Sequence, residues 1–189
     1  MLRQTRNNGI RGDATMRTRA CALLLSAALL PSLALSEELT LDVANDWARA
    51  TIAACRNQGH AVTVAYMGPD GELRLLARGD GAPARTLDIA RRKAYTVIKT
   101  GKTSGDFGAS VAPPAGAAPA APVPGALPGQ VPGKDVDTNL IIWAGGLPVM
   151  RGSVLLGAVS VSGAPGGDKD EACAKAGLEA IRATLTAAP

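Results

Sequence analysis

His60 is the residue of this sequence best suited to ligating a cofactor, and it is the only histidine among 189 residues. A neutral imidazole is the usual protein ligand of haem iron. The alternative is a partly exposed histidine in the loop after a helix, with no ligand. With one histidine and no acidic residue at ligand spacing, neither a zinc site nor a Ser-His-Asp triad is predicted. We therefore expect no catalytic residues and no metal-ion site.

The loop Arg78-Gly79-Asp80-Gly81 is the tightest polar cluster in the sequence. Arg78 could pair with a carboxylate of a ligand, and the glycines would let that ligand approach the backbone. Arg78, Asp80 and Gly81 are therefore binding candidates. A loop with an internal pair between Arg78 and Asp80 explains the same residues without a ligand, because turn chemistry alone favours glycine.

Tyr95 and two glycine-containing segments complete the candidates that residue chemistry provides. A phenolate can ligate ferric haem, although an aromatic residue on a helix more often packs against a sheet. Gly145 and Gly146, together with Ser162-Gly163, could line the same cleft through their backbone N–H groups. The alternative is that these glycines only end strands.

Cys55 and Cys173 lie on the apolar stripes of two predicted helices. A buried stripe does not favour an activated thiolate, so neither cysteine is a predicted nucleophile. The two could form a disulfide if their helices lie side by side, and two buried free thiols are the alternative.

The first 36 residues are typical of a signal peptide for export. Two arginines precede an apolar run over residues 21–35, and small residues at its end offer a cleavage site. The run is shorter than the roughly 20 residues that a membrane span needs. We predict cleavage after Ser36 and a periplasmic or secreted mature chain without a membrane span. Met16 offers an alternative start, which would make residues 1–15 an over-long gene prediction.

The chain that follows the predicted signal peptide carries no net charge. The whole sequence has a formal net charge of +4, but residues 1–36 hold five arginines and one aspartate. The rest therefore has fifteen charges of each sign. No Lys/Arg run has interleaved aromatic residues, so nucleic acid is not a predicted partner. Residues 37–189 have the size of a single domain.

Hydrophobic periodicity predicts an α+β domain with three main helices and five strands. The helices begin near Leu41, with Thr40 as the predicted N-cap, and near Pro83 and Asp168. Short links between strands favour antiparallel pairing, so we expect a five-stranded antiparallel sheet. The five predicted strands cover residues 61–67, 72–77, 140–144, 147–150 and 154–161.

Residues 102–134 separate the two halves of the domain and show no hydrophobic period. Their central part, 112–133, is almost entirely Ala, Pro, Gly and Val, which is typical of an extended loop. We interpret this Ala/Pro-rich loop as a spacer.

Four segments in one order form a pattern over residues 39–186. They are Arg78-Gly79-Asp80-Gly81-Ala82 with a helix carrying Lys93-Ala94-Tyr95-Thr96, then Gly145-Gly146-Leu147-Pro148-Val149, then Leu156-Gly157-Ala158-Val159-Ser160-Val161-Ser162-Gly163, and the acidic opening of a last helix at Asp168. Together these segments resemble the GlcG/HbpS family.

The resemblance implies a profilin-like fold and a homo-oligomer. It also implies haem as a cofactor, because some exported members bind haem and the related C-terminal domain of PduO-type corrinoid proteins can hold it. A threonine has been implicated in haem binding by secreted relatives, which makes Thr96 a candidate; its alternative role is a hydrogen bond to its own helix. Glu72 stands where the corrinoid-linked relatives have a liganding histidine.

Three hypotheses follow. The first is an exported, non-catalytic protein that binds or senses haem or another tetrapyrrole. The second is an enzyme or accessory domain for a small carboxylic acid, which Arg78 beside glycines and the glycolate-operon setting of some relatives favour. The third is a structural or assembly module.

Overall fold

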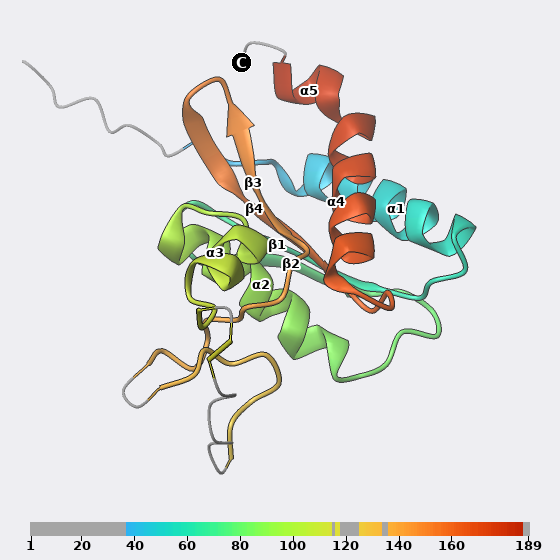
Figure 1. Cartoon of the computed structure of the whole chain (residues 1–189). Helices are drawn as coiled ribbons and strands as arrows, with labels where there is room; N and C mark the ends of the chain where they lie inside the picture. The colour runs from blue at the N-terminus through green and yellow to red at the C-terminus, as the bar shows by residue number, and fades with distance from the viewer. Residues whose placement is uncertain (1–36, 115, 118–124, 134–135, 187–189) are drawn as a thin grey trace, which may run out of the picture. The chain divides into compact units, whose positions relative to one another are not determined.

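The structure is a computed structural model that describes residues 37–114, 116–117, 125–133 and 136–186. The predicted signal peptide and the centre of the Ala/Pro-rich loop lie outside the described residues. What is described is a three-layer arrangement of helices on both faces of one sheet (Figure 1). None of the described helices is long and apolar enough to cross a membrane.

The sheet has four antiparallel strands in the order β2-β1-β4-β3. β1 (Thr63–Met67) and β2 (Leu73–Arg78) form one hairpin, and β3 (Gly146–Arg151) and β4 (Val154–Ser162) form the other. β1 pairs with β4 in the centre, which joins the two hairpins into one sheet. The α+β class and the antiparallel pairing are confirmed.

The prediction of a fifth strand over residues 140–144 was wrong for the described part of the chain. Only one isolated bridge forms there, between Ile141 and Gln130. The Ile141 N–H donates to the side chain of Thr96 at 2.9 Å, and the Ile142 N–H donates to the Gly129 carbonyl at 2.9 Å. Because a helix side chain and a loop take these backbone groups, the apolar segment is buried without joining the sheet.

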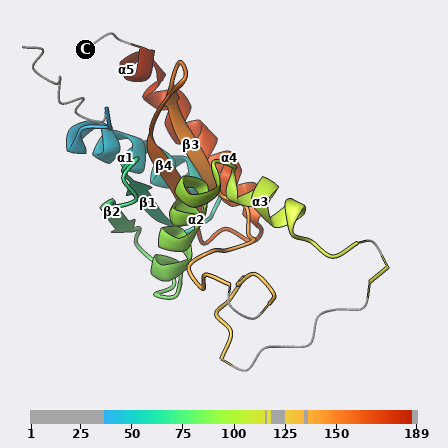
Figure 2. The same cartoon turned by 90° about the vertical axis from the view of Figure 1, so that its left-hand side faces the viewer.

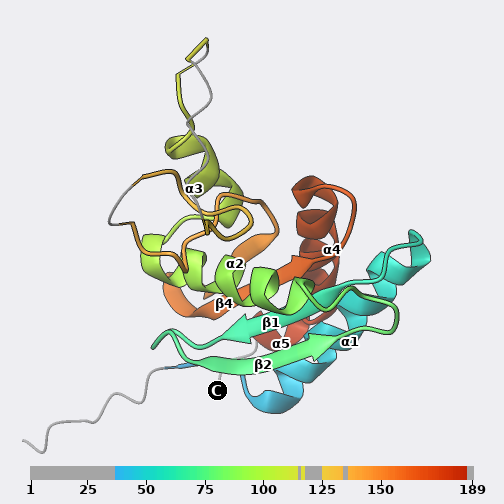
Figure 3. The ribbon, with the colours of Figure 1, turned by 90° about the horizontal axis from the view of Figure 1, so that it is seen from below.

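Two of the predicted helices cover one face of the sheet, and they are α1 (Leu41–Asn57) and α4 (Gly167–Ala180). Thr40 caps α1, as predicted, by accepting from the Val43 N–H. The third predicted helix, α2 (Thr86–Thr100), covers the opposite face (Figure 3).

The described residues form five helices, where three main ones were expected. α3 (Ser104–Ser110) precedes the predicted Ala/Pro-rich loop and lies beside α2 (Figure 2). α5 (Arg182–Thr186) follows a break at the end of α4. α3 was not predicted because it contains Gly105 and Gly108, and glycine has a low helix propensity. They occur there because α3 packs so closely on the 142–144 segment that a Cβ would clash with it.

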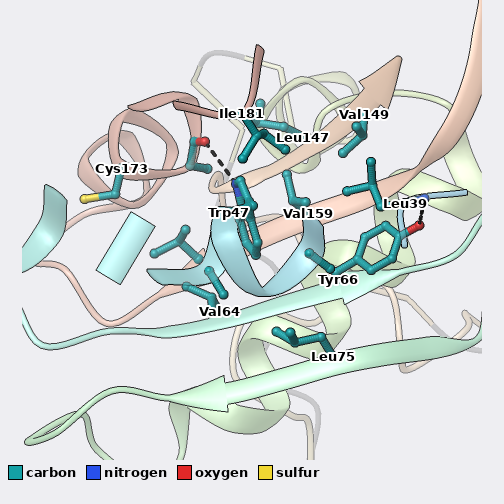
Figure 4. Packing of buried hydrophobic residues seen from close by; sticks show 14 of the residues in the cluster. Leu39, Trp47, Val64, Tyr66, Leu75, Leu147, Val149, Val159, Cys173 and Ile181 are labelled. Atoms are coloured by element: carbon teal, nitrogen blue, oxygen red, sulfur yellow. Dashed lines mark hydrogen bonds between the residues drawn. The ribbon is translucent and has the colours of Figure 1, made fainter. Parts of the chain in front are cut away.

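The main core lies between the sheet and the α1/α4 layer (Figure 4). Trp47 of α1 is fully buried at its centre, and its indole N–H lies 3.5 Å from the Ala174 carbonyl of α4. Cys55 and Cys173 form a disulfide between the two helices, which settles the alternative that the sequence left open. Gly177 brings α4 against Thr51, where a side chain would not fit.

Candidate functional site

Two of the sequence candidates, His60 and Asp80, meet in a hollow between the end of α1 and the loop after β2. We call it the histidine hollow; its volume is about 240 Å³, and Arg56, Gly59 and Gly79 also line it. His60 is half-buried. Gly79 donates to the Val62 carbonyl at 2.9 Å, and a Cβ there would lie 2.8 Å from that oxygen. Only glycine therefore fits at position 79, where the loop after β2 packs against Val62.

The loop over residues 78–81 does not contain the ion pair between Arg78 and Asp80 that its sequence made possible. Asp80 lies 4.0 Å from Arg56 of α1, and both side chains are largely exposed. Arg78 is exposed and makes no ion pair with any other described residue. Gly81 adopts a positive φ of 81° at the turn and is exposed. Arg78 and Gly81 thus flank the histidine hollow without lining it.

Thr96 is fully buried, and its hydroxyl has two backbone partners. It donates to the Arg92 carbonyl at 2.9 Å and accepts from the Ile141 N–H at 2.9 Å. Thr96 therefore has the alternative role, a hydrogen bond to its own helix. Its second hydrogen bond, from the Ile141 N–H, holds the segment that follows the Ala/Pro-rich loop.

Tyr95 of α2 is half-buried and does not line the histidine hollow. Its hydroxyl donates to the Asp137 carboxylate at 2.6 Å, and Lys99 lies 5.5 Å from the ring centroid. This hydrogen bond raises the pKa of Tyr95 and lowers the pKa of Asp137. A raised pKa disfavours the phenolate that would ligate ferric iron.

Gly145 and Gly146 surround Lys93, a residue that the sequence analysis placed only in a motif. A Cβ on Gly145 would lie 2.8 Å from the Lys93 Nζ, and one on Gly146 would lie 2.7 Å from the Lys93 carbonyl oxygen. The Gly146 N–H donates to the Ser104 hydroxyl at 2.8 Å. These glycines are packing residues that let α2 and α3 approach the start of β3.

Lys93 and Asp170 form a buried ion pair across the end of the sheet. The Lys93 Nζ lies 2.7 Å from Asp170 Oδ2 and donates to the Val161 carbonyl at 2.8 Å. Asp170 Oδ1 accepts from the Ala164 N–H at 2.9 Å. Burial lowers the pKa of Lys93 and raises the pKa of Asp170, and their mutual attraction opposes both shifts. Perturbed pairs of this kind mark candidate sites when they face a cleft.

That pair does face a cleft, the larger of the two hollows. This lysine cleft has a volume of about 390 Å³ and is also lined by Arg85, Ile89, Trp143 and Gly163. Trp143 is 42% exposed, and the exposed Arg85 stands at the start of α2. Ser162 and Gly163 line this cleft and not the hollow that holds Asp80, whereas Gly145 and Gly146 line neither, so these candidates do not share one cleft.

Sequence patterns do not reveal the lysine cleft, because Lys93 and Asp170 are 77 residues apart in the chain. Asp170 falls in an acidic stretch that looks like ordinary helix capping. One signal was present: Lys93 occupies a position on the α2 stripe that otherwise carries buried residues.

Comparison with known proteins agrees with this fold. The sequence model of one family, described as "Haem degrading protein HbpS-like", matches residues 39–179. That range holds both hollows and most of the described chain. The chain belongs to this HbpS-like family, as the resemblance implied. A comparison with curated proteins finds no match.

Solved structures of the same kind superpose on most of the chain. A double mutant of HbpS from Streptomyces reticuli shares 31% identity, covers 77% of this chain and 88% of its own, and has a TM-score of 0.61. The ORFY protein of Klebsiella pneumoniae shares 26% identity, covers 78% and 92%, and has a TM-score of 0.63. The PduOC:haem complex, at 19% identity, covers 76% and 95% with a TM-score of 0.62 and supports the fold alone.

Proposed function

We propose that this protein binds haem or a related tetrapyrrole, without transforming it, after export from the cytoplasm. The observation that carries haem binding is the family match over residues 39–179, together with 31% identity to HbpS across most of both chains. The non-catalytic part rests on the sequence prediction of no catalytic residues, and it is tested separately because the family's description names haem degradation. One solved relative of the same fold is described as a haem complex.

The histidine hollow holds the side chain that would bind haem iron. His60 provides the only imidazole of the chain, and Gly79 and Asp80 leave open space beside it. At about 240 Å³ the hollow falls below the roughly 300–1,000 Å³ of enclosing ligand pockets. A tetrapyrrole would therefore lie partly across the protein surface, and a second copy of the chain would cover its outer side. This arrangement makes a homo-oligomer part of the proposal.

Two features support export to the periplasm or the medium. The first is the signal-peptide pattern of residues 1–36. The second is the Cys55–Cys173 disulfide, since such bonds persist in oxidising compartments.

The test is a haemin titration of the mature chain, followed by the Soret band. We expect a shifted band that saturates in proportion to protein, and at least tenfold weaker binding for His60→Gly. Added imidazole should restore the band of this variant, while Asn57→Ala, an exposed change at the same end of α1, should leave it unchanged. Absence of any shift with the unmodified protein would disprove haem binding.

Other outcomes refine the proposal. Unaltered haemin binding by His60→Gly would exclude this residue as the ligand. Loss of the Soret band over time in the presence of a reductant and oxygen would show haem degradation and overturn the non-catalytic part. Size-exclusion chromatography with light scattering tests the oligomer: a monomer with bound haemin would contradict it.

A further inference from the structure

The lysine cleft is separate from the histidine hollow and shares no lining residue with it. Its volume of about 390 Å³ lies in the lower part of the range for small-molecule sites. Its walls combine one aromatic and one aliphatic side chain with glycine backbone, which leaves a recess with both apolar and polar surface.

Arg85 gives the cleft an available positive charge. Seven other described arginines make ion pairs, whereas Arg85 and Arg78 make none with described residues. Arg85 also stands at the N-cap position of α2 without making a capping bond. A guanidinium at the rim of a recess, with no ion-pair partner among the described residues, can take a carboxylate in a bidentate fashion.

Lys93 offers a second donor at the floor. An ammonium group has three N–H donors. Asp170 and the Val161 carbonyl take two of them, so among the described residues the third has no acceptor. The side chain is only 2% exposed and lines the cleft, and a buried donor without a partner destabilises the fold unless water or a ligand accepts from it.

The net charge of the cleft fixes the charge of its ligand. Arg85 and Lys93 contribute two positive charges, and Asp170 neutralises one of them. One negative charge on the ligand therefore balances the site. Trp143 and Ile89 provide an apolar wall for whatever the ligand carries beside its acid group.

We propose that the lysine cleft binds a small monocarboxylic acid with a second oxygen next to the carboxylate, such as a 2-hydroxy acid. Arg85 holds the carboxylate, the free N–H of Lys93 donates to the neighbouring oxygen, and the substituent lies against Trp143. This site is additional to the proposed haem site and does not depend on it.

Tryptophan fluorescence gives a direct measurement, because the chain has two tryptophans and the other, Trp47, is fully buried. The mature chain is titrated with lactate and with mandelate, and with their neutral amides. We expect saturable changes with both acids, tighter binding of mandelate because its ring contacts Trp143, and no response to lactamide or mandelamide.

The discriminating variant is Arg85→Gln, which alters an exposed side chain and leaves the fold intact. It should weaken acid binding at least tenfold, while Arg49→Gln, an exposed change on α1, should not. Calorimetry with Trp143→Phe should still detect binding after the fluorescence change is lost.

Three results would overturn the inference: no saturation with either acid up to about 10 mM by fluorescence and calorimetry, equal binding of acids and amides, or full affinity in Arg85→Gln. Haemin binding is measured on the same variants. It should be unaffected by Arg85→Gln, and acid binding should be unaffected by His60→Gly, so each proposal can fail without the other.

Discussion

The two faces of the sheet are built from different kinds of side chain. The face under α1 and α4 is covered by a continuous cluster of seventeen buried apolar residues, whereas the cluster under α2 has four. Besides apolar side chains, the α2 side buries many polar and charged ones: Thr63, Thr86, Arg92, Lys93, Thr96, Ser160 and Ser162.

The two helix layers are therefore attached to the sheet by different kinds of interaction. Apolar area stabilises the α1/α4 layer without fixing any particular donor or acceptor. The α2 layer is held by directed bonds, such as Ser160 to the Ala90 carbonyl at 2.6 Å and Arg92 to the Pro128 and Leu140 carbonyls at 2.7 and 2.9 Å. Directed bonds position polar groups, and the lysine cleft opens beside this layer. The α1/α4 face should therefore dominate stability, and the polar contacts of the α2 side should dominate acid binding in the lysine cleft.

The largest effect expected is on the α1/α4 face, from loss of the disulfide. Cys55 and Cys173 are 118 residues apart, and closing a loop of that length lowers the entropy of the unfolded chain. We expect Cys55→Ala/Cys173→Ala to lower the free energy of unfolding by about 5 kcal/mol. Chemical denaturation measures this, and a reductant should destabilise the unmodified chain but not the variant. A loss under about 1 kcal/mol would contradict the assignment.

The second-largest effect is expected at the Lys93–Asp170 ion pair, which joins the helices of the two faces. Lys93→Met leaves the Asp170 carboxylate buried without its cation, which should lower stability by about 3–5 kcal/mol. Adding Asp170→Asn removes that charge and keeps an acceptor for the Ala164 N–H, so the double variant should recover part of the loss.

Lys169→Met, an exposed change next to Asp170 on α4, is the control and should stay within about 0.5 kcal/mol. Denaturation of the single and double variants gives their coupling energy. If the two losses are simply additive, the ion pair contributes nothing specific.

The third prediction concerns Tyr66, a polar group within the apolar face. Its hydroxyl donates to the Leu156 carbonyl and accepts from the Leu39 N–H, each at 2.8 Å, and burial raises its pKa to about 12. The folded chain holds this proton up to about pH 12, but the unfolded chain loses it near pH 10. Stability from this group is therefore complete below pH 10 and falls by about 3 kcal/mol as pH rises to 12.

Tyr66→Phe isolates this contribution. At neutral pH the variant should be less stable by about 1–2 kcal/mol, because two buried backbone groups lose their partner. The difference from the unmodified chain should shrink above pH 10 and change sign by about pH 12, because the unmodified chain alone loses the stability linked to this proton; denaturant titration at each pH measures it. A constant difference across that range would show that the phenol is not buried.

The sequence predicted what depends on local periodicity. The two hairpins, the three main helices and the Thr40 cap follow from apolar spacing and turn residues, and structure confirms them. Residues 140–144 were misassigned because an apolar run shows that a segment is buried, but not which groups take its backbone bonds. There Thr96 and Gly129 took them.

The candidate site was predictable only in part, for the same reason. His60 and Asp80 were both named, yet no pattern brings them together, and Arg56, the actual partner of Asp80, was not considered. Lys93 and Asp170 lie on helices on opposite faces of the sheet, so neither periodicity nor capping rules connect them. Family motifs marked the right segments without saying which side chains face a cleft.

The smallest effect is expected at Arg85, and it is measured against the effect of a buried arginine on the same side of the sheet. Arg85→Gln should change the free energy of unfolding by less than about 0.5 kcal/mol, because its side chain has no ion pair among the described residues. Arg92 is buried on the same helix, and its guanidinium donates to two loop carbonyls. Arg92→Gln should therefore lower the free energy of unfolding by more than about 1 kcal/mol. Thermal and chemical denaturation of both variants test this contrast. If Arg85→Gln is as destabilising as Arg92→Gln, the charge at the rim serves the fold, and the α2 face has no arginine reserved for a ligand.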